Sequence, residues 1–455
     1  MNHPSPSLQG RQKIAVVGGG VSGLSAAWLL SQRHDVVLYE AGRTLGGHSH
    51  TVDVEVAGAP TAVDTGFIVY NELTYPNLTA LFRHLEVPTL ATDMSFAVSL
   101  DDAKVEYGGA GLAPFFGRPS NLFRPRFWSM LRDLWRFYHS ASADLGRLDD
   151  GAMTLGEYLN AEGYGRAFQD DHLLPQAAAI WSASVEAIRD YPAVAFIRFF
   201  ENHGLLKLVG RPIWRTVQGG SRVYVERLAA PYRDKVRLNA PVTSVRRIES
   251  GGAWVTDGRV VVERFDAVVL ACHAKEALAM LADPTPRERA LLGAFRYTRN
   301  VAVLHTDVRL MPRRRPVWSA WNYMGAKGPD GARDLCVTYW MNRLQGLKTP
   351  RPLLLTLNPL FAPDPAQVLH TEVYEHPLFD LAALTAQREL WSLQGRADTW
   401  FCGAHFGAGF HEDGLKSGLA VAEALGGVKR PWVTPEEPAD IHPRPTSAAT
   451  ESLAA

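Results

Sequence analysis

A glycine-rich turn between short apolar runs constrains the fold of this chain more than any other feature. Residues 13–17 (KIAVV) are apolar and lead directly into Gly18, Gly20 and Gly23, which are spaced as G-x-G-x-x-G. Residues 24–30 (LSAAWLL) are rich in helix formers. This order predicts a strand, a tight turn and a helix, the opening of a βαβ unit, and an incidental glycine-rich turn would lack this context.

The residue types in this unit suit a bound dinucleotide. Gly18 permits the tight turn, Gly20 lets the backbone approach a pyrophosphate, and Gly23 lets the helix pack closely on the strand. The first turn of the helix, which includes Ser22, offers free N–H groups to the anion. Glu40 ends the next apolar run, where it would accept hydrogen bonds from ribose hydroxyls and repel a 2′-phosphate. The pattern therefore favours FAD or NAD over NADP.

A second glycine pair distinguishes FAD from NAD. Gly46, Gly47 and His48 follow shortly after Glu40, and the segment 64–67 (DTGF) comes next. Further glycine backbone near a pyrophosphate is what a longer, flavin-bearing dinucleotide would use. The alternative is that both segments are surface turns.

Composition excludes several classes of protein. The chain has 455 residues, a formal net charge of zero, 46% hydrophobic residues and three cysteines. The length predicts two domains, and the neutral charge argues against nucleic-acid binding. The three cysteines lie far apart and form no C-x-x-C motif, so the sequence supports neither a disulfide scaffold nor a zinc ribbon. No histidine spacing, His48-x-His50 included, predicts a metal site. Without an apolar leader or a membrane-length apolar run, we expect a cytoplasmic protein.

Strand-rich and helix-rich segments alternate along the chain, so the two domains are expected to interleave. We predict a FAD-binding domain made of residues 11–105, 215–285 and 398–430. The intervening material predicts a substrate domain with a helical part, 106–214, and a sheet part, 286–397. Residues 431–455 are rich in Pro, Ser, Thr and Ala and are predicted to be a disordered tail.

Taken together, these motifs resemble the flavin-containing amine oxidase superfamily, which includes monoamine and polyamine oxidases, phytoene-type desaturases and protoporphyrinogen oxidase. The likeness is carried by residues 16–30, 39–51, 64–67, 218–228, 265–278 and 400–418, in the order of the family. More narrowly, the chain resembles a bacterial group of predicted flavoproteins recognised by GGHSHT, PQAAAIWS, TYWMNRLQ and GFHEDG. That group is often found with cyclopropane-fatty-acid-synthase-like enzymes, and one activity ascribed to it is desaturation of methyl-branched acyl chains on the way to furan fatty acids.

The resemblance implies an α/β fold with a discontinuous Rossmann-like FAD-binding domain and a mixed α+β substrate domain. It implies noncovalent FAD, because Cys402 does not match the position of a covalent flavin link. Carried over, the residues near the pyrophosphate, ribose, ribityl chain, adenine and flavin ring are Gly18, Gly20, Ser22, Gly23, Glu40, Gly46, Gly47, His48, Gly66, Phe67, Val242, Gly403, Phe410 and His411. Phe410 and His411 would open the last helix beneath the flavin.

Several positions depart from the family pattern. His48 stands where the family usually has Arg, and His405 stands where an acid is common. The amine oxidases place a Lys near flavin N5, on a strand that matches residues 296–306, yet this chain has no Lys between Lys275 and Lys327. Phe410 replaces a Tyr of the amine-flanking cage. These departures argue against ordinary amine oxidation.

Two stretches combine basic and aromatic residues. Residues 115–138 contain five arginines and one acid, and residues 309–321 contain RLMPRRR followed by two tryptophans. This composition suits an interfacial helix on anionic lipid, or equally an amphipathic helix that covers a core with its arginines exposed. Trp321, Tyr339, Trp340 and Phe410 are candidate substrate contacts, and the alternative for the aromatic strands is plain core packing.

The sequence therefore predicts an FAD-dependent oxidoreductase that acts on an apolar substrate. The specific expectation is desaturation of a fatty-acyl chain, free or in phospholipid, by hydride transfer to flavin N5. The alternatives are a double-bond isomerase of unsaturated fatty acids, an amine oxidase, and a noncatalytic flavin-bound partner of a lipid methyltransferase. Peripheral contact with the inner face of the membrane would involve 115–138 and 309–321. No residue is assigned as a catalytic base.

Overall fold

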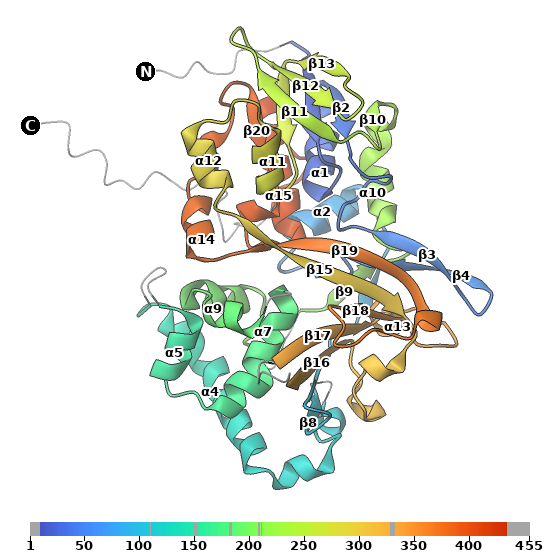
Figure 1. Cartoon of the computed structure of the whole chain (residues 1–455), viewed down its shortest axis with the longest axis vertical. Helices are drawn as coiled ribbons and strands as arrows, with labels where there is room; N and C mark the ends of the chain where they lie inside the picture. The colour runs from blue at the N-terminus through green and yellow to red at the C-terminus, as the bar shows by residue number, and fades with distance from the viewer. Residues whose placement is uncertain are drawn as a thin grey trace, which may run out of the picture. The chain divides into compact units, whose positions relative to one another are not determined.

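A computed structural model describes residues 10–109, 111–148, 153–181, 184–207, 210, 212–327 and 333–434 (Figure 1). The chain forms two compact units, each built from separate segments. Unit 1 contains Met1–Leu45, Ala229–Phe295 and Ala382–Ala455. Unit 2 contains Gly46–Leu228 and Arg296–Leu381. Each unit is described by itself.

Unit 1 is centred on a five-stranded sheet in the order β10-β2-β1-β14-β20, and every pair in it is parallel. Its strands are β1 (Lys13–Val17), β2 (Asp35–Tyr39), β10 (Val236–Arg237), β14 (Ala267–Leu270) and β20 (Thr399–Phe401). Almost every residue of β1, β2 and β14 is buried. Near-continuous apolar runs form such strands because helices cover both faces of a parallel sheet.

Helices α1 (Val21–Leu30) and α15 (His411–Gly426) pack closely against each other in unit 1. The Ser25 hydroxyl donates to the Leu415 carbonyl, and a Cβ on Gly418 would lie 2.1 Å from the Ser22 carbonyl oxygen. Glycine at this position therefore sets how closely the two helices approach. The other described helices of unit 1 are η3 (Ala230–Lys235), α11 (Ala274–Met280), α12 (Pro286–Leu292), α14 (Leu381–Gln387), η7 (Leu390–Leu393) and η8 (Ala404–Phe406). Helix α10 (Arg222–Ala229), which precedes η3, lies in unit 2 except for its last residue.

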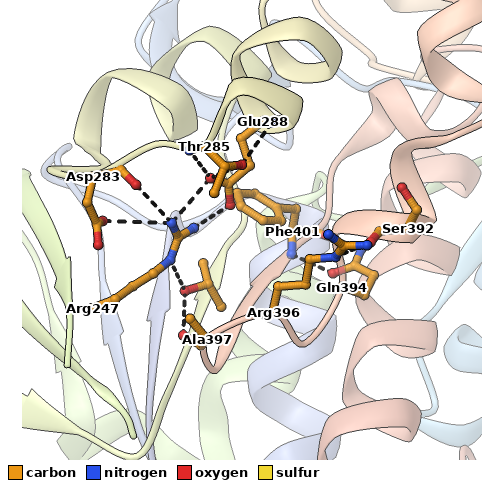
Figure 2. A network of polar contacts seen from close by, with 10 residues as sticks. Arg247, Asp283, Thr285, Glu288, Ser392, Gln394, Arg396, Ala397 and Phe401 are labelled. Carbon is orange, nitrogen blue, oxygen red and sulfur yellow. Dashed lines mark hydrogen bonds and ion pairs between the residues drawn. The ribbon is translucent and has the colours of Figure 1, made fainter. Parts of the chain in front are cut away.

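An antiparallel sheet of β11 (Val242–Arg247), β12 (Ala253–Asp257) and β13 (Val262–Phe265) completes unit 1. Figure 2 shows how Arg247 connects this sheet to neighbouring elements. Its buried guanidinium pairs with the buried carboxylate of Glu288 and donates to Thr399 Oγ1 at 3.1 Å. Glu288 also accepts from the backbone and hydroxyl of Thr285, which begins α12. One buried ion pair thus joins β11, α12 and β20.

Unit 2 contains a seven-stranded sheet in the order β19-β15-β18-β17-β16-β7-β8. All pairs are antiparallel except β16 with β7. The strands are β7 (Phe96–Leu100), β8 (Val105–Gly108), β15 (Arg296–His305), β16 (Trp321–Lys327), β17 (Arg333–Trp340), β18 (Leu354–Leu357) and β19 (Val368–Leu378).

Smaller sheets and a helical region make up the rest of unit 2. The hairpin β3 (Thr51–Val56) and β4 (Ala59–Asp64) is antiparallel, as is the sheet of β5 (Tyr70–Asn71), β9 (Trp214–Val217) and β6 (Thr89–Thr92). The helices are α2 (Pro76–His84), α3 (Leu112–Phe115), η1 (Pro119–Phe123), α4 (Pro125–Asp144), α5 (Leu155–Ala161), α6 (Arg166–Phe168), η2 (Gln169–Leu173), α7 (Leu174–Trp181), α8 (Val185–Arg189), α9 (Ala193–Asn202), η4 (Val308–Leu310), η5 (Arg315–Val317), α13 (Met341–Leu344) and η6 (Pro365–Gln367).

The boundaries of the two compact units differ from the predicted boundaries of the FAD-binding and substrate segments. Of the predicted FAD-binding segment 11–105, residues 46–105 lie in unit 2, because β7 and β8 extend its seven-stranded sheet. Residues 215–228 also lie in unit 2, whereas 286–295 and 382–397 lie in unit 1. The assignment of the segments to cofactor and substrate stays a prediction. Residues 435–455 of the predicted tail lie outside the described residues.

Candidate functional site

The glycine-rich turn has the geometry that its sequence predicts. Gly18 has φ +111°, and a Cβ there would lie 2.5 Å from the Ala271 carbonyl oxygen. A Cβ on Gly23 would lie 1.9 Å from the Gly18 carbonyl oxygen. Side chains at these two positions would collide with backbone, so glycine is needed for α1 to begin directly after β1 and beside β14.

Gly20 differs from its neighbours because a Cβ there would meet nothing within 4 Å. It is the N-cap of α1 and makes no side-chain cap hydrogen bond. There is therefore open space beside the start of this helix, and a helix N-terminus is a site where a phosphate binds. The turn fits the pyrophosphate of a dinucleotide.

Glu40 lies over this turn at the end of β2. Its carboxylate accepts hydrogen bonds from the backbone N–H of Gly19 at 2.7 Å and of Gly42 at 2.6 Å. A carboxylate has about four acceptor positions, so two contacts leave capacity for ribose hydroxyls. Val242, predicted to lie by the adenine, begins β11 in the same unit.

The C-terminal motif places a second helix start against the first. A Cβ on Gly414 would lie 2.8 Å from Val21 Cγ1 and 3.0 Å from Ser22 Oγ. The Ser417 hydroxyl accepts from the Gly403 N–H at 2.9 Å, which fixes the end of β20 to α15. Two helix N-termini of unit 1 therefore lie side by side, and both favour negative charge.

Titratable groups at the start of α15 are shifted towards neutrality. Burial lowers the pKa of His411 to about 3 and, with help from nearby His273, that of His405 to about 3. Burial raises the pKa of Asp413 to about 6, although the Phe410 N–H and Lys416 act to lower it. Asp413 accepts from the Phe410 N–H at 2.9 Å, so it caps the helix. At neutral pH both imidazoles are uncharged.

Gly46, Gly47, His48, Gly66 and Phe67 lie in unit 2, where the two motifs pair through their backbones. The Phe67 N–H donates to the His48 carbonyl at 2.6 Å. A Cβ on Gly66 would lie 2.1 Å from that same oxygen, and one on Gly46 would lie 2.3 Å from the Ser49 carbonyl. The structure therefore brings GGHSH and DTGF together, as the flavin prediction requires.

Asp64 is a central residue that the sequence reasoning left without a role. Its buried carboxylate accepts from Thr51 Oγ1 at 2.5 Å, from Ser221 N and Oγ at 2.9 Å each, and from Gln345 Nε2 at 2.8 Å. Burial raises its pKa to about 6 against these hydrogen bonds. Thr51, Ser221 and Gln345 each lie in a motif that carries the family resemblance. The presence of all these motifs in one chain is the sequence feature that could have indicated a shared contact with Asp64.

The candidate substrate residues of unit 2 do not form one group. Trp321 and Tyr339 are cross-strand partners on β16 and β17, with their rings edge to face at 4.9 Å. Trp340 instead packs against a core cluster that includes Trp318, with Arg315 over both rings. Phe410 lies in unit 1. Core packing therefore accounts for Trp340, while Trp321 and Tyr339 stay candidates.

The two basic–aromatic stretches differ in how their arginines are used. In 309–315, Arg309 pairs with Asp307, Arg313 with Asp102, and Arg314 with Glu106. This stretch is therefore largely neutralised by its own neighbours.

The stretch 115–138 contains η1 and α4. Phe123, Trp128 and Trp135 expose 86%, 49% and 59% of their surface, while Phe127 and Phe137 are buried. Helix α4 thus covers a core with one face and exposes large aromatic rings on the other. None of the helices in the described ranges is long and apolar enough to cross a membrane.

The fold and the geometry of the turn identify the structural class of this protein: an α/β protein with a Rossmann-like dinucleotide-binding turn. A family model of flavin containing amine oxidoreductases matches residues 21–425, and the chain belongs to this family. The family match confirms FAD as the cofactor and oxidoreductase as the enzyme class. The predicted α/β fold class is confirmed by the family match and by the fold of solved structures. The predicted role of each individual site residue stays a prediction.

The proteins that are similar to this chain have names that refer to different substrates. Carotenoid phi-ring synthase of Streptomyces griseus is 29% identical over 73% of this chain, which covers 65% of that protein, under two thirds of its length. A CLA-producing fatty acid isomerase from P. acnes has a TM-score of 0.64 at 15% identity over 92% of this chain and 99% of its own. Cyclohexylamine oxidase from Brevibacterium oxydans has a TM-score of 0.64 at 17% identity over 92% and 99%. At these identities the two structures show the fold alone.

Proposed function

We propose that this protein is an FAD-dependent oxidoreductase that desaturates a fatty-acyl chain, free or in phospholipid. The observation that carries the proposal is β15, the strand that matches the lysine-bearing strand of the amine oxidases. It runs from Arg296 to His305 without a Lys. An enzyme without that Lys departs from amine oxidation at the position nearest the reactive flavin atom.

Two further observations support an apolar substrate. Trp321 and Tyr339 present large rings from adjacent strands of unit 2, and apolar pockets for small molecules are lined mainly by such side chains. The names of two similar proteins refer to a carotenoid and a fatty acid, which are both long apolar molecules.

FAD would supply the redox chemistry, since oxidised flavin accepts a hydride. Desaturation removes a hydride and a proton from adjacent carbons. The hydride would leave with its electron pair to the flavin, and the proton would pass to a base, either a side chain or water, while the remaining electron pair forms the double bond. The chain's own contribution is binding: the start of α1 at Gly20, the adjacent start of α15, and Glu40 suit the pyrophosphate and ribose. With His405 and His411 neutral at pH 7, they would accept or donate hydrogen bonds rather than supply positive charge.

Anaerobic mixing tests the proposal. The purified holoenzyme should lose its flavin absorbance at about 450 nm when mixed with monounsaturated or methyl-branched fatty acids or phospholipids. Mass spectrometry should then find the acyl chain lighter by two hydrogens. Bleaching by putrescine or cyclohexylamine, with none by any lipid, would contradict the proposal and support amine oxidation.

A double-bond isomerase is the second candidate, favoured by the shared fold with a fatty acid isomerase. In that reaction the hydride returns to the substrate, so product forms without consumption of an electron acceptor. Incubation of linoleic acid with holoenzyme, with and without an artificial acceptor, separates the two reactions. Equal yields of a shifted diene in both would favour isomerisation.

We also propose that η1 and the exposed face of α4 contact anionic lipid. Phe123, Trp128 and Trp135 are exposed there, beside Arg132 whose side chain is 73% exposed. Vesicles of phosphatidylglycerol should bind the protein more strongly than vesicles of phosphatidylcholine, and Phe123→Ser/Trp128→Ser should lose that binding. Binding that is unchanged in this variant would exclude the surface.

The remaining alternative is a noncatalytic flavoprotein that binds a lipid methyltransferase. It predicts retained FAD, no turnover with any lipid, and co-purification with a cyclopropane-fatty-acid-synthase-like enzyme. Affinity purification from the native host, followed by assay of the eluted complex, tests it.

A further inference from the structure

One face of β19 carries an alternating row of polar residues. His370, Glu372 and Tyr374 are two residues apart, so their side chains project from the same face of the strand. His50, which immediately precedes β3, lies against this row. One potential ligand atom from each of His50, His370 and Glu372 falls within 4.8 Å of the other two. The sequence predicted no metal site because these residues come from distant segments.

The distances suit a small divalent ion. Glu372 Oε2 lies 3.6 Å from His370 Nε2 and 3.9 Å from His50 Nδ1. A tetrahedral ion that is bound at about 2.0–2.2 Å holds its ligand atoms roughly 3.3–3.6 Å apart. Small rotations of the half-buried side chains, which move the ligand atoms by a few tenths of an ångström, would bring the distances of these two pairs of atoms to those of a tetrahedral site.

The nitrogen of His370 supplies a second, independent observation. His370 Nε2 is shielded from solvent and has no hydrogen-bond partner among the residues that the structure describes. Buried polar atoms nearly always have a partner, and one that has none calls for an ion or water. This atom faces the Glu372 carboxylate, which is where an ion between them would lie.

Neighbouring hydroxyls tolerate metal binding by His50. Thr65 Oγ1 and Tyr374 Oη lie 2.9 and 3.2 Å from His50 Nδ1. If that nitrogen binds an ion, Thr65 still has the His50 carbonyl at 3.2 Å and Tyr374 still has Thr65 Oγ1 at 2.8 Å. Neither hydroxyl is therefore left without a partner when His50 Nδ1 binds an ion.

We propose that His50, His370 and Glu372 bind a divalent first-row transition ion such as Zn²⁺. Two imidazoles and one carboxylate form a ligand set that zinc proteins use when a position stays open to water. The ion would connect the His48–His50 segment to β19, two residues from His48. The inference rests on these three side chains alone and does not depend on the proposed substrate.

Direct metal binding tests this inference on the full-length protein after treatment with a chelator and gel filtration. Titration with Zn²⁺ alone, in competition with a chromophoric chelator, should give one equivalent of tight sites. His370→Gln and Glu372→Gln should each weaken binding by at least about tenfold. His376→Gln is the matched control, because His376 lies on the same face of β19 but outside the cluster, and should bind as the wild type does.

Two further measurements guard against a folding artefact. Co²⁺ added to the wild-type protein should give the visible absorption of a four- or five-coordinate nitrogen–oxygen site. Zn²⁺ should also raise the Tm of the wild type and the His376→Gln variant, but not that of His370→Gln. Equal Zn²⁺ affinity in the wild type and in a His370→Gln/Glu372→Gln double variant would overturn the proposal, as would an octahedral Co²⁺ spectrum identical to that of the free ion.

Discussion

Asp64 should make the protein less stable as the pH rises from about 4 to about 7. Burial raises its pKa from 3.8 to about 6, so the folded state holds this proton more tightly than the unfolded chain does. The stabilisation is fully present below the unfolded pKa and is lost as the pH rises through the folded one. A shift of about two units is worth roughly 3 kcal/mol, at about 1.4 kcal/mol per unit.

Comparison with Asp64→Asn isolates this contribution, because the amide does not titrate. The variant loses a constant amount of stability, since its NH₂ group faces donors from Thr51, Ser221 and Gln345. The free energy of unfolding, measured with urea from pH 4 to pH 7, should fall by about 2.5 kcal/mol more in the wild type than in the variant, most of the full effect of roughly 3 kcal/mol.

Asp53→Asn is the control with the opposite sign. Asp53 is exposed and pairs with Arg222, whose hydrogen bonds lower its pKa. Its small contribution to stability is present above the unfolded pKa and is lost as the pH falls. Parallel pH profiles for the wild type and Asp64→Asn would refute the argument that burial of Asp64 outweighs its hydrogen bonds.

Two sets of substitutions test unit 1. Arg247→Met should cost about 3–5 kcal/mol of unfolding free energy because it leaves the buried Glu288 carboxylate without a cation, and a loss below about 1 kcal/mol by urea unfolding would contradict this. Gly20→Ala should change stability by no more than about 1 kcal/mol, since its Cβ meets no atom, yet should lower the FAD retained on gel filtration. Gly23→Ala should instead destabilise the fold by about 1–3 kcal/mol or more, because its Cβ meets the Gly18 carbonyl. Equal FAD retention by Gly20→Ala and the wild type would exclude the proposed pyrophosphate position.

The dinucleotide turn could be predicted from sequence because its determinants are local. β1, the turn and α1 follow one another directly, and the clashes at Gly18 and Gly23 involve that turn and the adjacent end of β14. The spacing of the glycines is therefore enough to predict most of the geometry of the turn between β1 and α1. The parallel sheet followed from the apolar runs, whose near-continuous burial needs helices on both faces.

Long-range pairing could not be predicted in the same way. Asp64 binds Ser221 and Gln345, which are 157 and 281 residues away, and no local pattern indicates which donors a buried acid will meet. Strand β7 pairs with β16 in register from Phe96 and Trp321, so segment 96–108 joins the sheet of unit 2 through a partner that is more than 200 residues away in sequence. The compact units differ from the predicted segments for this reason.

Among the residues predicted to hold FAD, the backbone is the main source of positive potential for the cofactor phosphates. The residues predicted to hold FAD include no Lys or Arg, and His48 stands where the family usually has Arg. His405 and His411 do not supply the missing charge, since burial keeps both neutral at pH 7. What unit 1 does provide is two helix N-termini in contact, at Gly20 and beside Gly414. Helix ends carry a partial charge that does not titrate, so the contribution of these two helix ends to FAD binding should not depend on pH.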